Sequence, residues 1–137
     1  APSSPPRRFA PRPGRWPALT SPDGTPVDLT RAPQRGEASD IAYVGPLPDP
    51  AWYELARPDG LTVRVQWDAT TLPYCWLWYE PEATAGYPWY GRLMAFGVEP
   101  FSSWPTDGLA TAVANGSALT FAPGATRSYW MAVEVRG

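Results

Sequence analysis

The chain has 137 residues, a formal net charge of −2, and neither lysine nor histidine. This length allows one domain with a real core, and the eight Trp and seven Tyr argue against global disorder. The near-neutral charge provides no general basis for nucleic-acid binding, no apolar run approaches the ~20 residues of a membrane span, and a metal cluster of His and Cys cannot form. We therefore expect no nucleic acid, membrane, metal or cofactor, and a cytoplasmic location. The absence of lysine beside many Ala, Pro, Gly and Arg is typical of a bacterial genome rich in G and C.

Residues 1–26 are dominated by Pro, Ser, Arg and Gly. Because proline removes backbone donors and fixes φ, this stretch is unsuited to a helix or a central strand. We predict an extended arm or linker over residues 1–26 and a β-sandwich domain over residues 27–137. The basic residues of the arm could form a basic patch, but the favoured interpretation is that they are solvated: Arg7, Arg8, Arg12 and Arg15.

The first part of the predicted domain is typical of short strands. Ile41–Val44 and Ala51–Ala56 are rich in β-branched and aromatic residues, and Arg57–Gly60 contains an Asp-Gly pair that favours a tight turn. Leu61–Trp67 then alternates apolar with polar residues, which indicates a strand with one buried face.

The second part continues the pattern. Tyr74–Tyr79 is a continuous aromatic run that suits a strand covered on both faces, and Leu93–Phe101 predicts a further strand. Leu109–Ala114 is too short to assign, whereas Ala118–Phe121 and Ser128–Val135 predict the last two strands. No segment offers an amphipathic helix of ten residues. The fold class we predict is all-β, an antiparallel β-sandwich.

The single cysteine, Cys75, lies between Tyr74 and Trp76 in the aromatic run. A catalytic thiol normally needs a neighbouring base or cation, and the chain has no histidine to supply one. We expect Cys75 to be a small buried apolar residue.

Four groups of motifs occur in a fixed order along the chain. They are Trp16-Pro17 with Asp23-Gly24 and Val27-Asp28-Leu29; Trp67-Asp68 with Pro73-Tyr74 and Trp76-Leu77-Trp78; Pro88-Trp89-Tyr90 with Glu99-Pro100 and Phe101-Ser102-Ser103; and Leu119 to Gly124. In that order they resemble the C-terminal half of aldose 1-epimerase (galactose mutarotase-like) proteins, over most of the chain after residue 16. The resemblance implies part of a galactose mutarotase-like supersandwich, whose concave face holds a sugar. Since the family's enzymes are about twice as long, it also implies that an N-terminal half is missing.

The resemblance further implies a site chemistry. Family members interconvert the anomers of aldoses with a late Glu as base and a His as acid. The matching base is Glu99, and a partly buried carboxylate at a strand end can act as one. From the residues alone, the favoured interpretation is that Glu99 caps the strand end or pairs with an arginine such as Arg92. The histidine has no counterpart here. A Tyr or a second carboxylate could donate the proton, with Glu80 and Glu82 as candidates, unless the acid belongs to the missing half or was never present in this lineage.

Aromatic rings are the second predicted component of the site, because flat apolar sugar faces stack on them. The resemblance groups Trp76, Trp78, Trp89 and Trp104 with Glu99 as candidate substrate-binding residues. Trp76 and Trp78 are two residues apart and therefore share one face of their strand, which is either core or the lining of a groove. Trp89 is the better candidate for an exposed stacking platform, and Arg92 could hydrogen-bond sugar hydroxyls.

We therefore predict an aldose 1-epimerase-like protein that interconverts or binds the anomers of a monosaccharide or sugar derivative. The alternative is a non-catalytic carbohydrate-binding module, or an incomplete relative that works only with a missing N-terminal half. An incomplete sandwich leaves strand edges and apolar surface uncovered. We expect such a chain to form a homo-oligomer, to bind its missing half, or to aggregate.

Overall fold

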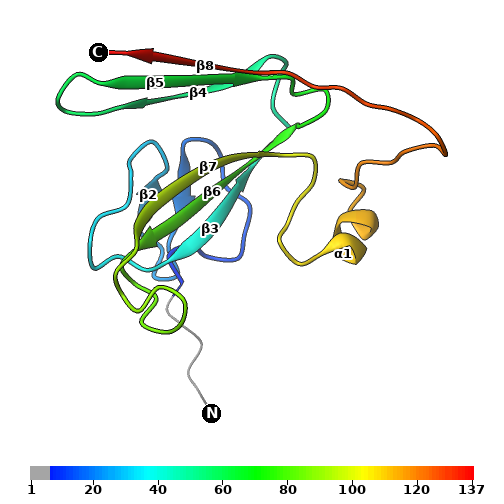
Figure 1. Cartoon of the computed structure of the whole chain (residues 1–137). Coiled ribbons are helices and arrows are strands. Elements are labelled where there is room, and N and C mark those ends of the chain that lie inside the picture. The colour runs from blue at the N-terminus through cyan, green and yellow to red at the C-terminus, as the bar shows by residue number, and fades with distance from the viewer. Residues whose placement is uncertain (1–6) are drawn as a thin grey trace. The chain divides into compact units, whose positions relative to one another are not determined.

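The computed structural model describes residues 7–137, and its regular structure is nearly all β (Figure 1). The strands are β1 (Ala18–Thr20), β2 (Pro26–Asp28), β3 (Asp40–Val44), β4 (Ala51–Ala56), β5 (Thr62–Trp67), β6 (Tyr74–Pro81), β7 (Met94–Phe101) and β8 (Met131–Arg136), and the helix is α1 (Leu109–Ala114). The sheets are antiparallel, which confirms the predicted all-β, sandwich-like fold class. No helix within residues 7–137 has the length and apolarity that a membrane crossing requires.

Contacts divide the chain into two compact units, each made of two separate segments. Unit 1 contains the described residues up to Val44 together with Trp76–Glu99, and unit 2 contains Gly45–Cys75 and Pro100–Gly137. The boundary expected at residue 26 has no counterpart in this division, because β2 begins at that residue and the described residues on both sides of it belong to unit 1.

Unit 1 contains a two-stranded sheet, β1-β2, and a three-stranded sheet in the order β3-β6-β7. The two strands β1 and β2 pair antiparallel, with Ala18 opposite Asp28. Their turn contains the Asp23-Gly24 motif: Asp23 accepts a hydrogen bond from the Thr25 N–H at 3.0 Å, and Gly24 has a φ of 95°. An Asx contact followed by a glycine in the left-handed region is a turn that sequence alone can specify.

The core of unit 1 is centred on Tyr79, which is fully buried. The ring of Phe9 lies 5.4 Å from it in an edge-on arrangement, and the ring of Phe96 lies 4.9 Å from it. Phe9 is itself 5% exposed, so within the described residues before β1 this side chain packs against β6 instead of extending into solvent. Burial of this one aromatic ring explains why the N-terminal segment, where it is described, is part of unit 1.

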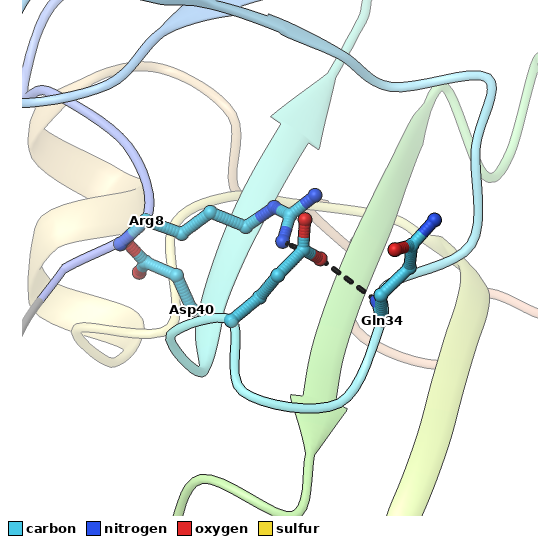
Figure 2. A network of polar contacts seen from close by, with 4 residues as sticks. Arg8, Gln34 and Asp40 are labelled. Atoms are coloured by element: carbon cyan, nitrogen blue, oxygen red, sulfur yellow. Dashed lines mark hydrogen bonds and ion pairs between the residues drawn. The ribbon is translucent and has the colours of Figure 1, made fainter.

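A polar network fixes the same segment (Figure 2). The Arg8 guanidinium is ion-paired with Glu37, whose Oε2 also accepts the Gln34 N–H at 2.8 Å, and it lies 4.9 Å from the centroid of the Tyr79 ring. The Asp40 carboxylate accepts the Arg8 N–H at 3.1 Å. The expectation that Arg8 is solvated is therefore wrong, since its side chain is only 9% exposed.

Unit 2 contains the sheet β4-β5-β8 and the helix α1. The predicted hairpin is confirmed: Ala51 pairs with Trp67 and Ala56 with Thr62, and the connecting turn is closed by the Arg57 N–H donating to the Leu61 carbonyl at 2.8 Å. The strand β8 pairs antiparallel with β5, so that Trp67 lies opposite Met131. Residues at alternate positions therefore give the sheet one apolar face: Ala51, Tyr53, Leu55, Val63, Val65, Trp67, Met131, Val133 and Val135.

Two sequence-based predictions differ from the structure, and one segment that the sequence left unassigned is defined by it. Leu109–Ala114, the unassigned segment, is helical, and the strand predicted over Ala118–Phe121 does not form. The Ala118 N–H instead donates to the carbonyl of Ala112 at 3.0 Å, which terminates the helix and leaves this group unavailable for a β-ladder. The strand β6 is not covered equally on both faces, because buried and half-buried residues alternate along it from Tyr74 to Tyr79.

Candidate functional site

The alternation along β6 separates its aromatic run into two sets. Cys75, Leu77 and Tyr79 are buried, whereas Trp76 and Trp78 are half-buried on the opposite face. This confirms the predicted orientation of the two tryptophans and the burial of Cys75. Trp76 and Trp78 consequently form a second, partly open apolar surface of unit 1, separate from the Tyr79 core.

Two further rings extend this surface. From β3, Tyr43 lies 5.6 Å from Trp76, with the ring planes at 84°. From the loop between β6 and β7, Trp89 lies 5.9 Å from Trp78, and its side chain is 37% exposed. We call Tyr43, Trp76, Trp78 and Trp89 the aromatic face. Tyr43 was not among the predicted site residues, although alternation around the buried Ala42 would have placed it opposite the core.

Glu99 lies beside the aromatic face. A Cβ atom built on Gly97 would lie 2.5 Å from Glu99 Oε1 and 3.4 Å from the Cβ of Trp78. The Glu99 carboxylate is therefore folded back over Gly97, on the side of β7 that faces the Trp78 side chain. Glu99 is half-buried, so its carboxylate is partly removed from water but still accessible. Among the described residues, none of the ion pairs joins Glu99 to Arg92.

The loop that carries Trp89 is closed by backbone hydrogen bonds. The Glu82 N–H donates to the Leu93 carbonyl at 2.8 Å, and the Gly91 N–H donates to the Thr84 carbonyl at 2.7 Å. Two residues of this loop other than glycine have positive φ, Glu82 at 64° and Tyr90 at 49°. Backbone in this region of φ is costly for such residues, and it persists only where the surrounding contacts impose it.

Glu80, the residue of β6 two positions before Glu82, supplies part of that constraint. It is 1% exposed and accepts hydrogen bonds from the N–H of Ala83 at 2.9 Å, from the N–H of Thr84 at 3.0 Å and from the Thr84 hydroxyl. Burial raises the pKa of Glu80, but the hydrogen bonds, chiefly those of Thr84, outweigh it and hold the pKa below its ordinary value. Glu80 is therefore an ionised residue that organises the loop.

The environments of Glu80 and Glu82 affect whether either residue can act as the general acid. A general acid must carry a proton at the working pH, and the lowered pKa of Glu80 opposes that. Glu82 forms an ion pair with Arg35 at 3.0 Å, so its carboxylate already has a charged partner. Glu80 does not have the environment of a proton donor.

The remaining predicted residues lie in two different places. Arg92 is exposed at the end of the Trp89 loop, where its backbone N–H donates to the Trp89 carbonyl at 3.0 Å. Trp104 belongs to unit 2, where its ring lies 6.5 Å from that of Tyr74 and its carbonyl accepts bonds from the side chains of Asn115 and Ser117. The structure thus brings Trp76, Trp78, Trp89 and Glu99 together within unit 1, whereas Trp104 is part of the other unit.

The site is an open face, and its donor set is not that of a metal centre. The described residues include no group of three or more Cys, Asp or Glu side chains able to hold a metal ion. An open hollow of unit 1 is lined by other residues, at the β1–β2 turn: Ala10, Pro11, Arg12, Ser21, Pro22, Asp23 and Gly24. The chemistry available on the aromatic face is therefore stacking on rings and hydrogen bonding or proton abstraction by Glu99.

The chain was compared with family models, curated proteins and solved structures. No family model, curated protein or solved structure matches the chain. Any function is accordingly argued from the site itself.

Proposed function

We propose that unit 1 binds an aldose on the aromatic face, with Glu99 as the group that accepts a hydrogen bond, and in catalysis the proton, from the anomeric hydroxyl. The substrate is a monosaccharide or a sugar derivative, and the chemistry is that of an aldose 1-epimerase, which opens a hemiacetal ring and closes it on the other face. This is the activity implied by the resemblance of the motifs, and a cytoplasmic location is part of the same proposal.

The observation that carries this proposal is the position of the Glu99 carboxylate over Gly97, next to the Trp78 side chain. A half-buried carboxylate beside open aromatic rings matches the two surfaces of a pyranose, which has apolar faces and a rim of hydroxyls. The ring of Trp89 lies 5.9 Å from that of Trp78, so more than one aromatic surface is available near the carboxylate. None of the ion pairs among the described residues involves Glu99, so its carboxylate is not committed to a structural ion pair.

A second candidate function is carbohydrate binding without catalysis. It is favoured by the state of the acidic residues, since Glu80 and Glu82 are both engaged as carboxylates and the chain has no histidine. Anomer exchange needs a proton donor for the ring oxygen as well as a base. In this second function the protein recognises the sugar with the same residues but does not exchange its anomers. Catalysis would then require an acid from a partner, such as a separate N-terminal half.

The experiment that separates the two functions measures exchange and binding on the same preparations. Freshly dissolved α-glucose and α-galactose are followed by polarimetry with and without the purified chain, and binding is followed by saturation-transfer NMR. An epimerase accelerates anomer exchange above the buffer rate and loses the acceleration in Glu99→Gln. A binding protein gives saturation transfer with no acceleration, and Glu99→Gln weakens the transfer.

The control is Asp107→Asn, which neutralises an exposed carboxylate in unit 2 and should change neither signal. Absence of both exchange and saturation transfer for these sugars, in a chain that is folded by circular dichroism, would remove the carbohydrate proposal. Exchange that persists in Glu99→Gln would instead exclude Glu99 as the base.

A further inference from the structure

The strand β8 exposes apolar side chains on the sheet face where β5 buries Val65 and Trp67. Met131 is 46% exposed, and Val133 and Val135 are each 62% exposed. Of their partners on β5, Val65 is 6% and Trp67 1% exposed, and Val63 is half-buried. The apolar face of this sheet therefore ends in an uncovered strip along β8. Contiguous exposed apolar surface of this kind marks an interaction site.

The same strand has a free edge. Within residues 7–137, β8 pairs with β5 on one side and is the terminal strand of the order β4-β5-β8. The Asp68 N–H donates to the Trp130 carbonyl at 3.2 Å, and this pair continues the β5–β8 register. Because hydrogen-bonded pairs alternate along an antiparallel ladder, Trp130 and every second residue after it direct their N–H and C=O groups toward β5. The residues between them direct their N–H and C=O groups to the free edge: Met131, Val133 and Val135.

This edge carries none of the features that normally prevent pairing. Exposed edges are commonly protected by lysine, by proline or by a charge that points to the apolar side. The chain has no lysine, residues 125–137 contain no proline, and the charged residues of β8, Glu134 and Arg136, lie on the opposite face of the strand. The outward backbone groups and the exposed apolar side chains thus belong to the same three residues.

We propose that this edge pairs with the β8 edge of a second copy of the chain, antiparallel and centred on Val133. In this register Val133 lies opposite its symmetry mate and Met131 lies opposite Val135, so every outward N–H and C=O between Met131 and Val135 finds a partner. The three apolar side chains remain on one face, and the two sheets become one continuous six-stranded sheet. The pairing is isologous, as expected for a two-fold dimer.

Two neighbouring registers would also keep the apolar residues on one face. One of them is disfavoured by charge and the other by the loss of a paired residue. Centring on Glu134 would place two glutamates directly opposite each other, which is unfavourable. Centring on Ala132 would leave Val135 without a partner on the strand. Centred on Val133, the pairing sets Glu134 against Ala132 and Arg136 against Trp130, and no like charges meet.

The first test is the mass of the intact chain in solution. Sedimentation equilibrium between about 1 and 100 μM should give the mass of two chains at the upper end. Val133→Pro removes an outward N–H and no bond to β5, so it should weaken the dimer about tenfold or more while the chain remains folded. A wild-type chain that stays monomeric across this range overturns the proposal.

The second test reads the register and does not depend on the proline variant folding. Opposed Cα atoms of a hydrogen-bonded antiparallel pair are ~5.5 Å apart, which lies within disulfide range. Val133→Cys should therefore form a covalent dimer under mild oxidation, seen on a non-reducing gel, whereas Glu134→Cys and Val135→Cys should not. The wild type is the control, because its Cys75 is buried. A covalent dimer through position 134 or 135, or none through 133, contradicts the proposed pairing.

Discussion

The carboxylate of Glu99 occupies the space that a side chain at Gly97 would fill. Glycine at this position has no positive φ to explain it, and its role is therefore to make room. The group that would be displaced is the end of a flexible side chain and not the backbone. A side chain at residue 97 should therefore move the Glu99 carboxylate without lowering the stability of unit 1.

Gly97→Ala should leave the fold intact and disable the site. Alanine is favoured over glycine in a strand interior by ~0.5–1 kcal/mol, so the melting temperature should stay level or rise slightly. The added methyl group moves the Glu99 carboxylate, and sugar binding should fall about tenfold in saturation-transfer titrations. Gly86→Ala is the matched control, since no atom lies within 4 Å of its Cβ. Equal sugar binding in the two variants would show that the position of Glu99 is irrelevant to binding.

Trp89→Ala should weaken sugar binding with little loss of stability. The residue is 37% exposed and its ring lies 5.9 Å from that of Trp78, so its removal should cost about 1 kcal/mol, against the 3–5 kcal/mol typical of a core tryptophan. Chemical denaturation measures this cost, and NMR titration measures binding. Trp52→Ala, which removes an exposed ring from unit 2, serves as the comparison. A loss near the core value would place Trp89 in the core of unit 1.

Glu80→Gln should lower stability at neutral pH and flatten its dependence on acid. Because the folded pKa of Glu80 lies below its ordinary value of about 4.3, the ionised group stabilises the folded state above that pH. This contribution is lost as the pH falls below about 4.3 toward the folded pKa. Urea unfolding at a series of pH values should show a steeper decline for the wild type than for Glu80→Gln. Parallel curves would mean that the carboxylate contributes nothing through its charge.

Arg8→Ala should destabilise unit 1 by roughly 2 kcal/mol, because it removes a nearly buried guanidinium that is ion-paired with the half-exposed Glu37 and lies over the Tyr79 ring. Thermal unfolding followed by near-ultraviolet circular dichroism reports the loss. Arg7→Ala changes an adjacent exposed arginine and should have no measurable effect. If the two variants melt together, the network in Figure 2 does not contribute to stability.

The sequence is informative wherever alternation and turn chemistry act locally. The hairpin β4–β5 follows from its Asp-Gly turn and its two-residue period, and the same period places Trp76 and Trp78 on one face of β6. These features depend on neighbours in the chain, which a reader of the sequence can see. The position of Trp89 against Trp78 depends on a loop whose conformation is fixed partly by Glu80 and partly by backbone hydrogen bonds, and no local pattern indicates it.

Long-range packing accounts for what could not be predicted. The segment of Arg8 and Phe9 looks like a solvated arm, because proline and arginine dominate it, yet the Phe9 ring and the Arg8 guanidinium both pack against Tyr79. The apolar alternation of β8 predicts a buried face, and instead the strand lies exposed at a sheet edge. Periodicity gives the side of a strand that is apolar, but it does not say what covers that side.

The two units are interleaved along the chain, and this affects the order in which they can form during synthesis. Unit 1 lacks β6 and β7 until the ribosome has passed Glu99, while unit 2 begins at Gly45 and is completed only by β8 near residue 137. During the interval, β4 and β5 are present without their third strand. The nascent chain therefore leaves the β8-pairing edge of β5 open during this interval, and the backbone groups of that edge are available to another strand.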